Sequence, residues 1–159
     1  MHISFENQVA LVTGAAYGLG LATAKAFAAS GAAVALADRH ESAVHRAAEE
    51  LAASGHRTLA ICCDVSDDAQ VEAMVEQTVS AFGRLDAAYN NAGVQNVLAE
   101  TADCPRGDYD RVMAVNLRGV WSCMKFESPC WWRFQWDATD VPRKLLTLCC
   151  GFAARRQAM

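Results

Sequence analysis

Short apolar runs alternate with longer mixed stretches along the first 125 residues of the chain. Within each run the apolar residues follow one another almost without a break, which is typical of strands buried on both faces of a parallel sheet. Each run ends at polar residues or at glycine, where a buried strand would leave the sheet. The pattern predicts four strands, at residues 9–12, 33–37, 59–62 and 85–89.

The stretches between these runs have the features of helices, predicted at residues 19–30, 41–54, 66–82 and 109–125. The first three are each followed by a residue suited to a left-handed C-terminal cap, namely Gly31, Gly55 and Gly83. We predict that Ser66 is the N-cap of the third helix, with Asp67 and Asp68 in its first turn. Asp108 is the predicted N-cap of the last helix.

Strand and helix alternate repeatedly, which predicts an α/β fold with a parallel sheet and right-handed crossovers. We expect the strand order third, second, first, fourth, with helices on both faces. The fourth strand would then lie at an open edge, so the sheet would be an incomplete version of the doubly wound type, with about four strands.

A glycine-rich loop joins the first predicted strand to the first predicted helix. Gly14 would permit the tight turn, and Gly18 and Gly20 would let the backbone and the helix come close to a pyrophosphate. The helix N-terminus would then offer free N–H donors to the phosphates. A purely structural turn also uses glycines, so the loop alone leaves both interpretations open.

Four motifs occur in order along residues 9–124. They are the loop Thr13-Gly14-Ala15-Ala16-Tyr17-Gly18-Leu19-Gly20, the pair Asp64-Val65, the turn Asn90-Asn91-Ala92-Gly93 and the pair Val115-Asn116. In this combination the chain resembles the short-chain dehydrogenase/reductase family. The resemblance implies a Rossmann-type sheet that binds a nicotinamide dinucleotide.

The resemblance also implies a role for each matched position. Phosphates would lie against Gly14, Tyr17, Gly18, Leu19 and Gly20; adenine would lie against Asp64 and Val65; and the ribose beside the nicotinamide would lie against Asn90, Ala92 and Gly93. Two simpler interpretations stay open, because an aspartate there can cap the following helix and an asparagine pair can form a self-satisfied polar turn.

Asp38 ends the second predicted strand, where an acidic side chain would accept hydrogen bonds from the adenosine ribose hydroxyls. A carboxylate there repels a 2′-phosphate, so we expect NAD rather than NADP. Arg39 is the argument for NADP, because an arginine can hold that phosphate.

The catalytic part of the family pattern is incomplete. Family members move a hydride between an alcohol or ketone carbon and the nicotinamide, and a tyrosine with a lysine four residues later moves the alcohol proton. None of the three tyrosines in this chain is followed by a lysine at that spacing. The resemblance therefore assigns one catalytic residue, Asn116, while the catalytic serine, tyrosine and lysine are not present.

The sequence changes character after Glu127. Residues 1–127 carry a net charge of −7, whereas residues 128–159 carry +3 and three of the four tryptophans. We predict an NAD(P)-binding portion at 1–127 and an atypical tail at 128–159, either disordered or out-of-frame sequence on a truncated dehydrogenase, or a genuine partner-binding extension. The best candidate for a fifth strand in the tail is 144–149.

Composition narrows the function further. The net charge is −4 and no Lys/Arg-rich run occurs, which argues against a nucleic-acid partner. No apolar run reaches the roughly 18 residues that a membrane helix needs. The seven cysteines form no Cys-x-x-Cys pair, so we expect reduced thiols in a cytoplasmic protein and no metal site.

Two functions follow from these observations. The first is an NAD-dependent oxidoreductase that acts on a small-molecule secondary alcohol or ketone, inactive as this truncated chain; family resemblance also implies a homo-oligomer. The second is a non-catalytic dinucleotide-binding remnant or interaction protein. A methyltransferase of related fold is disfavoured, because the Asn-Asn-Ala-Gly turn would have no role in it.

Overall fold

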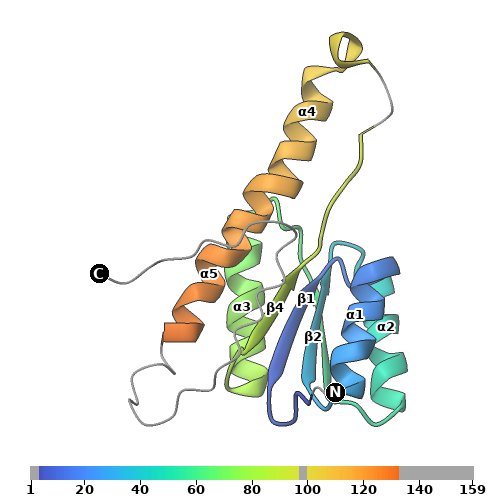
Figure 1. Cartoon of the computed structure of the whole chain (residues 1–159), viewed down its shortest axis with the longest axis vertical. Helices are drawn as coiled ribbons and strands as arrows, with labels where there is room; N and C mark the ends of the chain where they lie inside the picture. Colours follow the sequence, from blue (N-terminus) through green and yellow to red (C-terminus); the bar gives the residue numbers. More distant parts are fainter. Residues whose placement is uncertain (1–3, 97–99, 133–159) are drawn as a thin grey trace.

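A computed structural model describes residues 4–96 and 100–132, and its centre is one four-stranded parallel sheet (Figure 1). The strands are β1 (Val9–Thr13), β2 (Ala33–Asp38), β3 (Thr58–Cys62) and β4 (Ala87–Asn90). Their order is β3-β2-β1-β4, as the sequence predicts, and the α/β doubly wound fold class is confirmed. The first three strands match their predicted ranges to within one residue at either end.

The fourth strand begins two residues later than predicted. The Asp86 side chain accepts a hydrogen bond from the Val9 N–H at 2.8 Å, and the Asp86 N–H donates to the Val9 carbonyl at 2.9 Å. The Asp86 carboxylate thus accepts the Val9 N–H in place of a backbone carbonyl of the neighbouring strand. Regular pairing with β1 therefore starts only at Ala87.

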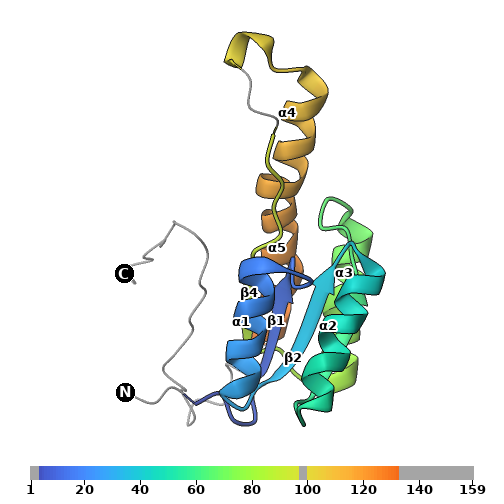
Figure 2. The ribbon, with the colours of Figure 1, turned by 90° about the vertical axis from the view of Figure 1, so that its right-hand side faces the viewer.

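Helices cover both faces of the sheet (Figure 2). One face packs against α1 (Gly18–Ala29) and α2 (Glu41–Ala53), and the other against α3 (Asp68–Phe82) and α5 (Val120–Trp132). A short 3-10 turn, η1 (Thr101–Asp103), precedes α4 (Arg106–Met113), and a π-helical segment, η2 (Ala114–Gly119), joins α4 to α5. In the described part of the chain, no helix combines the length and the apolar character that crossing a bilayer requires.

The cap of α3 differs from the prediction. Asp67, not Ser66, is the N-cap, and its Oδ1 accepts a hydrogen bond from the Ala69 N–H at 3.0 Å. Ser66 lies one residue before the cap, where its N–H and its hydroxyl both donate to Asp64 Oδ1. The predicted glycine cap is confirmed, since Gly83 has a left-handed φ of 83° at the C-terminus.

The helix predicted at 109–125 is longer than expected and begins earlier. Pro105 is the N-cap of α4, so Asp108 lies inside the first turn and does not cap the helix. Proline suits a helix start because the N–H that it lacks would have no partner within the helix. Through η2 the same rod continues into α5, and in Figure 1 α4 extends past the carboxyl ends of the strands.

The end of α5 passes the predicted boundary at Glu127 and reaches Trp132. Pro129 lies inside the helix and has no N–H for the Lys125 carbonyl, but the Ser128 hydroxyl donates to that carbonyl at 2.9 Å. The division at 127/128 stays a prediction, and the candidate strand at 144–149 lies outside the described residues.

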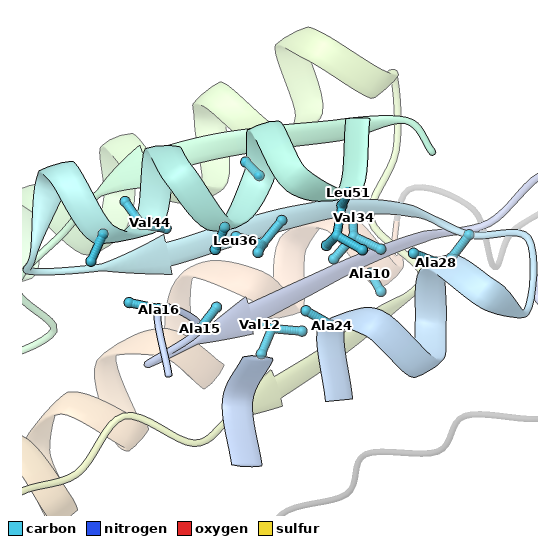
Figure 3. Packing of buried hydrophobic residues seen from close by; sticks show 14 of the residues in the cluster. Ala10, Val12, Ala15, Ala16, Ala24, Ala28, Val34, Leu36, Val44 and Leu51 are labelled. Carbon is cyan, nitrogen blue, oxygen red and sulfur yellow. The ribbon is translucent and has the colours of Figure 1, made fainter. Parts of the chain in front are cut away.

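The core consists of two layers, one on each face of the sheet. Alternate strand residues enter alternate layers, so Ala10 and Val12 face α1 and α2 while Val9 and Leu11 face α3 and α5. Figure 3 shows the first layer, in which the fully buried side chains of α1 are small, Ala24 and Ala28, while the larger Leu21 and Phe27 pack against it only partly buried. Small residues at this contact let α1 lie close to β1, and its N-terminus therefore stands directly over the end of that strand.

Candidate dinucleotide-binding site

A cleft of about 240 Å³ opens at the carboxyl ends of the strands. It lies where β1 is flanked by β2 on one side and β4 on the other, so the loops after the strands form its walls. Ligands of open α/β sheets bind at this switch point, because the crossovers leave in opposite directions there. The cleft is lined by Gly14, Tyr17, Asp38, Arg39, His40, Cys63, Asp64, Val65, Asn91, Ala92, Gly93, Val94 and Val115.

Eight of the predicted cofactor residues are among these lining residues: Gly14, Tyr17, Asp38, Arg39, Asp64, Val65, Ala92 and Gly93. Four others, Gly18, Leu19, Gly20 and Asn90, are not, and neither is Asn116. The binding and catalytic roles of all these residues stay predictions, and the geometry of each is described below.

The first two glycines of the loop both have positive φ, at 65° for Gly14 and 54° for Gly18. A Cβ on Gly14 would lie 2.9 Å from the Asn91 side-chain nitrogen, so this glycine is also required by packing. A Cβ on Gly18 would meet nothing within 4 Å. Gly18 therefore faces open space in which a ligand group can lie.

Gly20 has a packing role, and its predicted role in phosphate binding stays a prediction. It is buried, and a Cβ there would overlap the carbonyl oxygen of Gly14. Gly20 thus lets the first turn of α1 pack on the loop that leaves β1, which is an internal contact. The third glycine of dinucleotide loops has this packing role in general.

The N-terminus of α1 has no side-chain cap. Tyr17 is the N-cap residue and its side chain makes no capping hydrogen bond, whereas Asp67 caps α3. The first turn of α1 also contains no acidic residue, and Leu19 within it is exposed. Unpaired N–H groups and the positive end of the helix dipole therefore face solvent, which is an arrangement that binds anions.

Asp38 closes the neighbouring wall at the end of β2. Its Oδ2 accepts from the Ala16 N–H at 3.1 Å, and its Oδ1 accepts from the His40 N–H at 3.0 Å. A carboxylate offers about four acceptor positions, so capacity remains for further donors such as ligand hydroxyls. Arg39 is exposed beside it, and no ion pair joins it to any described residue.

The third wall follows β3 and is formed by Cys63, Asp64 and Val65. Burial, with the adjacent Asp64 carboxylate adding to it, raises the pKa of Cys63 to about 12, so the thiol stays neutral. Asp64 Oδ1 holds Ser66, and Asp67 caps α3, so the interpretation of Asp64 as the helix cap is wrong. Asp64 and the apolar Val65 together give this wall one acidic and one apolar surface.

The turn after β4 is tied directly to the glycine loop. Thr13 Oγ1 accepts from the Asn91 N–H at 3.0 Å and from the Ala92 N–H at 3.1 Å. In return, Asn91 Nδ2 donates to the carbonyls of Thr13 at 3.1 Å and Gly14 at 3.3 Å. These four bonds fix the distance between two walls of the cleft.

Asn90 points elsewhere. Its Nδ2 donates to Glu127 Oε2 on α5 at 3.1 Å, and its Oδ1 is buried without a partner among the described residues. Successive side chains of a strand face opposite sides of the sheet, so Asn90 and Asn91 cannot both face the glycine loop. The structure gives Asn91 that position.

Asn116 lies in the π-helical segment and holds the strand-to-helix loop. Its Oδ1 accepts from the Val94 N–H at 2.8 Å and its Nδ2 donates to the Val94 carbonyl at 2.9 Å. π-helical turns recur at functional sites, and here the turn brings Val115 to the cleft. Asn116 itself does not line the cleft. It holds the backbone of Val94, which does line it.

Sequence reasoning missed five lining residues: His40, Cys63, Asn91, Val94 and Val115. Two of them, Asn91 and Val115, belong to motifs that the sequence does show, and only the direction of their side chains was unknown. His40 follows Arg39 directly, and its ring meets that of Tyr17 edge to face with centroids 6.4 Å apart. No sequence signal links two residues so far apart in the chain.

Together these features place the chain among the Rossmann-type nucleotide-binding proteins. A comparison with known proteins narrows that class, because the model of the short chain dehydrogenase family matches residues 8–135. The chain belongs to this family, whose members are oxidoreductases that act on small molecules.

Several relatives have similar sequences. The chain is 40% identical over 121 residues to the (2S)-[(R)-hydroxy(phenyl)methyl]succinyl-CoA dehydrogenase subunit BbsD of Thauera aromatica, covering 76% of this chain and 48% of that protein. It is 39% identical over 125 residues to meso-2,3-butanediol dehydrogenase of Serratia marcescens, covering 79% and 49%. The chain therefore spans about half the length of the curated relatives it matches.

Solved structures give the same result. NAD⁺-bound xylitol dehydrogenase superposes with a TM-score of 0.78 at 35% identity, covering 80% of this chain and 49% of that one. The 3-ketoacyl-(acyl-carrier-protein) reductase of Brucella melitensis, complexed with NADH, gives 0.76 at 37% identity, covering 80% and 51%.

Proposed function

We propose that this chain binds NAD in the cleft, in preference to NADP, as the cofactor-binding part of an oxidoreductase that moves hydride between a secondary alcohol and a ketone. The observation that carries the proposal is the Asp38 carboxylate, which stands in the cleft beside the uncapped N-terminus of α1. The carboxylate suits ribose hydroxyls, and the uncapped helix N-terminus suits phosphates.

The residues present fit such a cofactor. The pyrophosphate would lie on the α1 N-terminus over Gly18, where a Cβ would meet open space. Asp38 would accept the adenosine ribose hydroxyls, Asp64 and Val65 would flank the adenine, and Ala92 and Gly93 would lie beside the nicotinamide ribose. When bound, the nicotinamide supplies the hydride chemistry.

The preference for NAD follows from charge. A 2′-phosphate would lie against the Asp38 carboxylate, whose two oxygens are already fixed by backbone N–H groups and cannot turn away. Arg39 is the opposing feature, because it is exposed beside the same wall and can reach a phosphate. Similar proteins in solved structures carry NAD or NADH, which supports the same choice.

The test is calorimetric titration of residues 1–159 with NAD and with NADP. We expect NAD to bind more tightly, and Asp38→Ala to lower NAD affinity by roughly 10- to 100-fold, since a hydrogen bond to a charged group contributes about 1.5–3 kcal/mol. The difference in affinity between NAD and NADP should therefore be smaller in Asp38→Ala than in the unmutated chain. Asp103→Ala, on an exposed aspartate of η1, is the control. Tighter binding of NADP by the unmutated chain would contradict the proposal.

Catalysis by these 159 residues alone is not part of the proposal. No tyrosine precedes a lysine by four residues, so the proton relay of the family has no residues to form it, and Asn116 alone cannot replace it. The alternative function is a non-catalytic dinucleotide-binding or interaction protein, and the exposed Leu117 and Trp121 on the outer side of the long helix favour a protein contact. A homo-oligomer and a cytoplasmic location stay predictions.

A further inference from the structure

The only acidic or basic side chain that is buried in the described ranges belongs to Glu127. It lies on α5 with an exposed fraction of 0% and is not part of the cleft. Its single hydrogen bond there comes from Asn90 Nδ2, which donates to Oε2 at 3.1 Å. A buried carboxylate with one amide donor is poorly compensated for the water that it has lost.

Each partner in this contact has one buried polar atom left over. Among the described residues, neither Asn90 Oδ1 nor Glu127 Oε1 has a hydrogen-bond partner. Both atoms are acceptors when the glutamate is ionised, so they cannot bond to each other. A proton on Oε1 turns that oxygen into a donor, and an acid then matches an amide with two hydrogen bonds, N–H to Oε2 and O–H to Oδ1.

The surroundings of Glu127 supply no compensating positive charge. No ion pair joins Glu127 to a described residue, and Lys125, two residues earlier, lies over the rings of Trp121 and Phe126. On α5 itself the neighbouring titratable group is the Cys123 thiol, whose pKa is raised by burial and then by Glu127.

The elements that pack against α5 add no cation that pairs with Glu127. On η2 the basic residue is Arg118, which is exposed and donates to the Ser66 carbonyl at 3.2 Å. On α3 the facing group is Asp68, whose Oδ1 accepts a hydrogen bond from the α5 residue Ser122 at 2.7 Å. On β4 the facing group is Asn90. The described groups around Glu127 are thus neutral or acidic, and they favour its uncharged form.

We propose that Glu127 is uncharged in the folded protein and forms a reciprocal pair of hydrogen bonds with Asn90, which makes it a positioning residue for the turn beside the cleft. Asn91, the next residue, is bonded to Thr13 and Gly14 in the glycine loop. The pair therefore holds one side of the β4 terminus against α5 while Asn91 holds the other side against β1. The effect on cofactor affinity rests on the proposed function, whereas the effect on stability does not.

The titration of Glu127 agrees with this geometry. Burial raises its pKa from the ordinary 4.5 to about 7, against a smaller lowering by the Asn90 amide. The folded chain then takes up a proton that the unfolded chain releases above pH 4.5. The contribution of protonated Glu127 to the stability of the folded chain is complete below that pH and declines as the pH rises through 7. Between pH 5 and 7 the folding equilibrium constant should fall roughly 40-fold through this group.

The decisive variant is Glu127→Gln in the full chain. Glutamine has the shape of the neutral acid and keeps one donor group, its NH₂, and one acceptor oxygen at every pH. Denaturant unfolding across pH 5–8 should show the parent losing roughly 40-fold in its folding constant between pH 5 and 7 relative to the variant. Glu76→Gln, on an exposed glutamate of α3, is the matched control and should follow the parent. Equal pH profiles for Glu127→Gln and the parent, or failure of Glu127→Gln to fold, would overturn the proposal.

A direct measurement on the unmutated chain keeps the test independent of any variant's folding. The infrared spectrum at pH 6 should contain the band of a protonated carboxyl group, and this band should be missing in Glu127→Gln. Absence of the band in the parent would also overturn the proposal. Neither readout contains NAD, so a chain that passes both and fails to bind NAD would contradict only the proposed function. If NAD does bind, its affinity should weaken between pH 6 and 8 in the parent more than in Glu127→Gln.

Discussion

At the scale of single residues, the three positions of the loop that hold glycine differ in what a side chain there would contact. Gly14 and Gly20 are fixed by internal contacts, with Asn91 and with the Gly14 carbonyl respectively, whereas Gly18 faces open space at a positive φ. Substitution at Gly14 or Gly20 therefore disturbs the fold and any ligand together. Gly18 is the position at which binding can be tested separately from folding.

Gly18→Val is expected to fold but not to bind NAD. The added side chain would stand where the pyrophosphate is proposed to lie, and its strained φ should cost about 1–3 kcal/mol. Gly55→Val is a matched control, because Gly55 also has a positive φ and open space around its Cβ but follows α2, away from the cleft. Both variants should lose similar stability by denaturant unfolding, and calorimetry should show loss of NAD binding only for Gly18→Val. Equal NAD binding by the two variants would mean that the loop is structural.

Residue direction also explains which part of the site the sequence predicts. Motif spacing identifies the walls, since Asp38, Asp64 and Ala92 line the cleft as expected. Spacing does not say which of two adjacent asparagines faces the glycine loop, because β4 is covered on both faces and lacks an alternating pattern. Asn90 is assigned to the cofactor by its position in the motif, which stays a prediction, and the structure shows that its side chain contacts Glu127.

At the scale of elements, the sequence predicts their types better than their ends. Buried apolar runs and glycine caps locate the strands and the first three helices. The predicted start of α3 is misplaced because Ser66, Asp67 and Asp68 are all good caps. Their partners decide among them, since Ser66 bonds to Asp64, Asp68 accepts from Ser122, and Asp67 accepts from the first-turn N–H groups. The π-helical segment gives no sequence signal, since its residues suit an ordinary helix equally well.

The cap of α3 gives a prediction at this scale. Asp67→Ala should lower the melting temperature more than Ser66→Ala does, because Asp67 accepts from the first-turn N–H groups of Ala69 and Gln70. Hydrogen bonds from the Gln70 side chain, then from the Gln70 and Ala69 backbone, lower the pKa of Asp67 below 3.8. The cap should therefore stabilise the protein above that pH and weaken as pH falls through the lowered pKa. Thermal unfolding at several pH values measures this, and a larger effect of Ser66→Ala would contradict it.

At the scale of the whole molecule, the described sheet ends at β4. Within residues 4–96 and 100–132, β4 pairs with β1 on one side and with no strand on the other. An unpaired strand edge is a template for association with another chain. The matched part of this chain covers only about half of each family relative, so the behaviour of this chain alone is a question separate from that of a whole dehydrogenase.

We expect residues 1–159 to show no dehydrogenase turnover and to self-associate. General acid–base groups contribute about 100- to 10,000-fold to rate, so without the tyrosine and lysine the rate should stay near background even with NAD bound. NAD reduction against a panel of secondary alcohols tests the first part, and sedimentation velocity tests the second. A soluble monomer with about one turnover per second, as in ordinary enzymes, would show that other residues supply the proton relay.

The Thr13 hydroxyl has a consequence for how the sheet opens. It accepts the backbone hydrogens of both Asn91 and Ala92, across the junction between β1 and β4. Those two hydrogens are protected from exchange with deuterium while the hydroxyl accepts them, and Thr13→Val removes this acceptor without a large change of side-chain shape. Their exchange rates in the parent and in Thr13→Val therefore report how firmly the hydroxyl joins two walls of the cleft, and they can be followed in the free chain before any ligand is known.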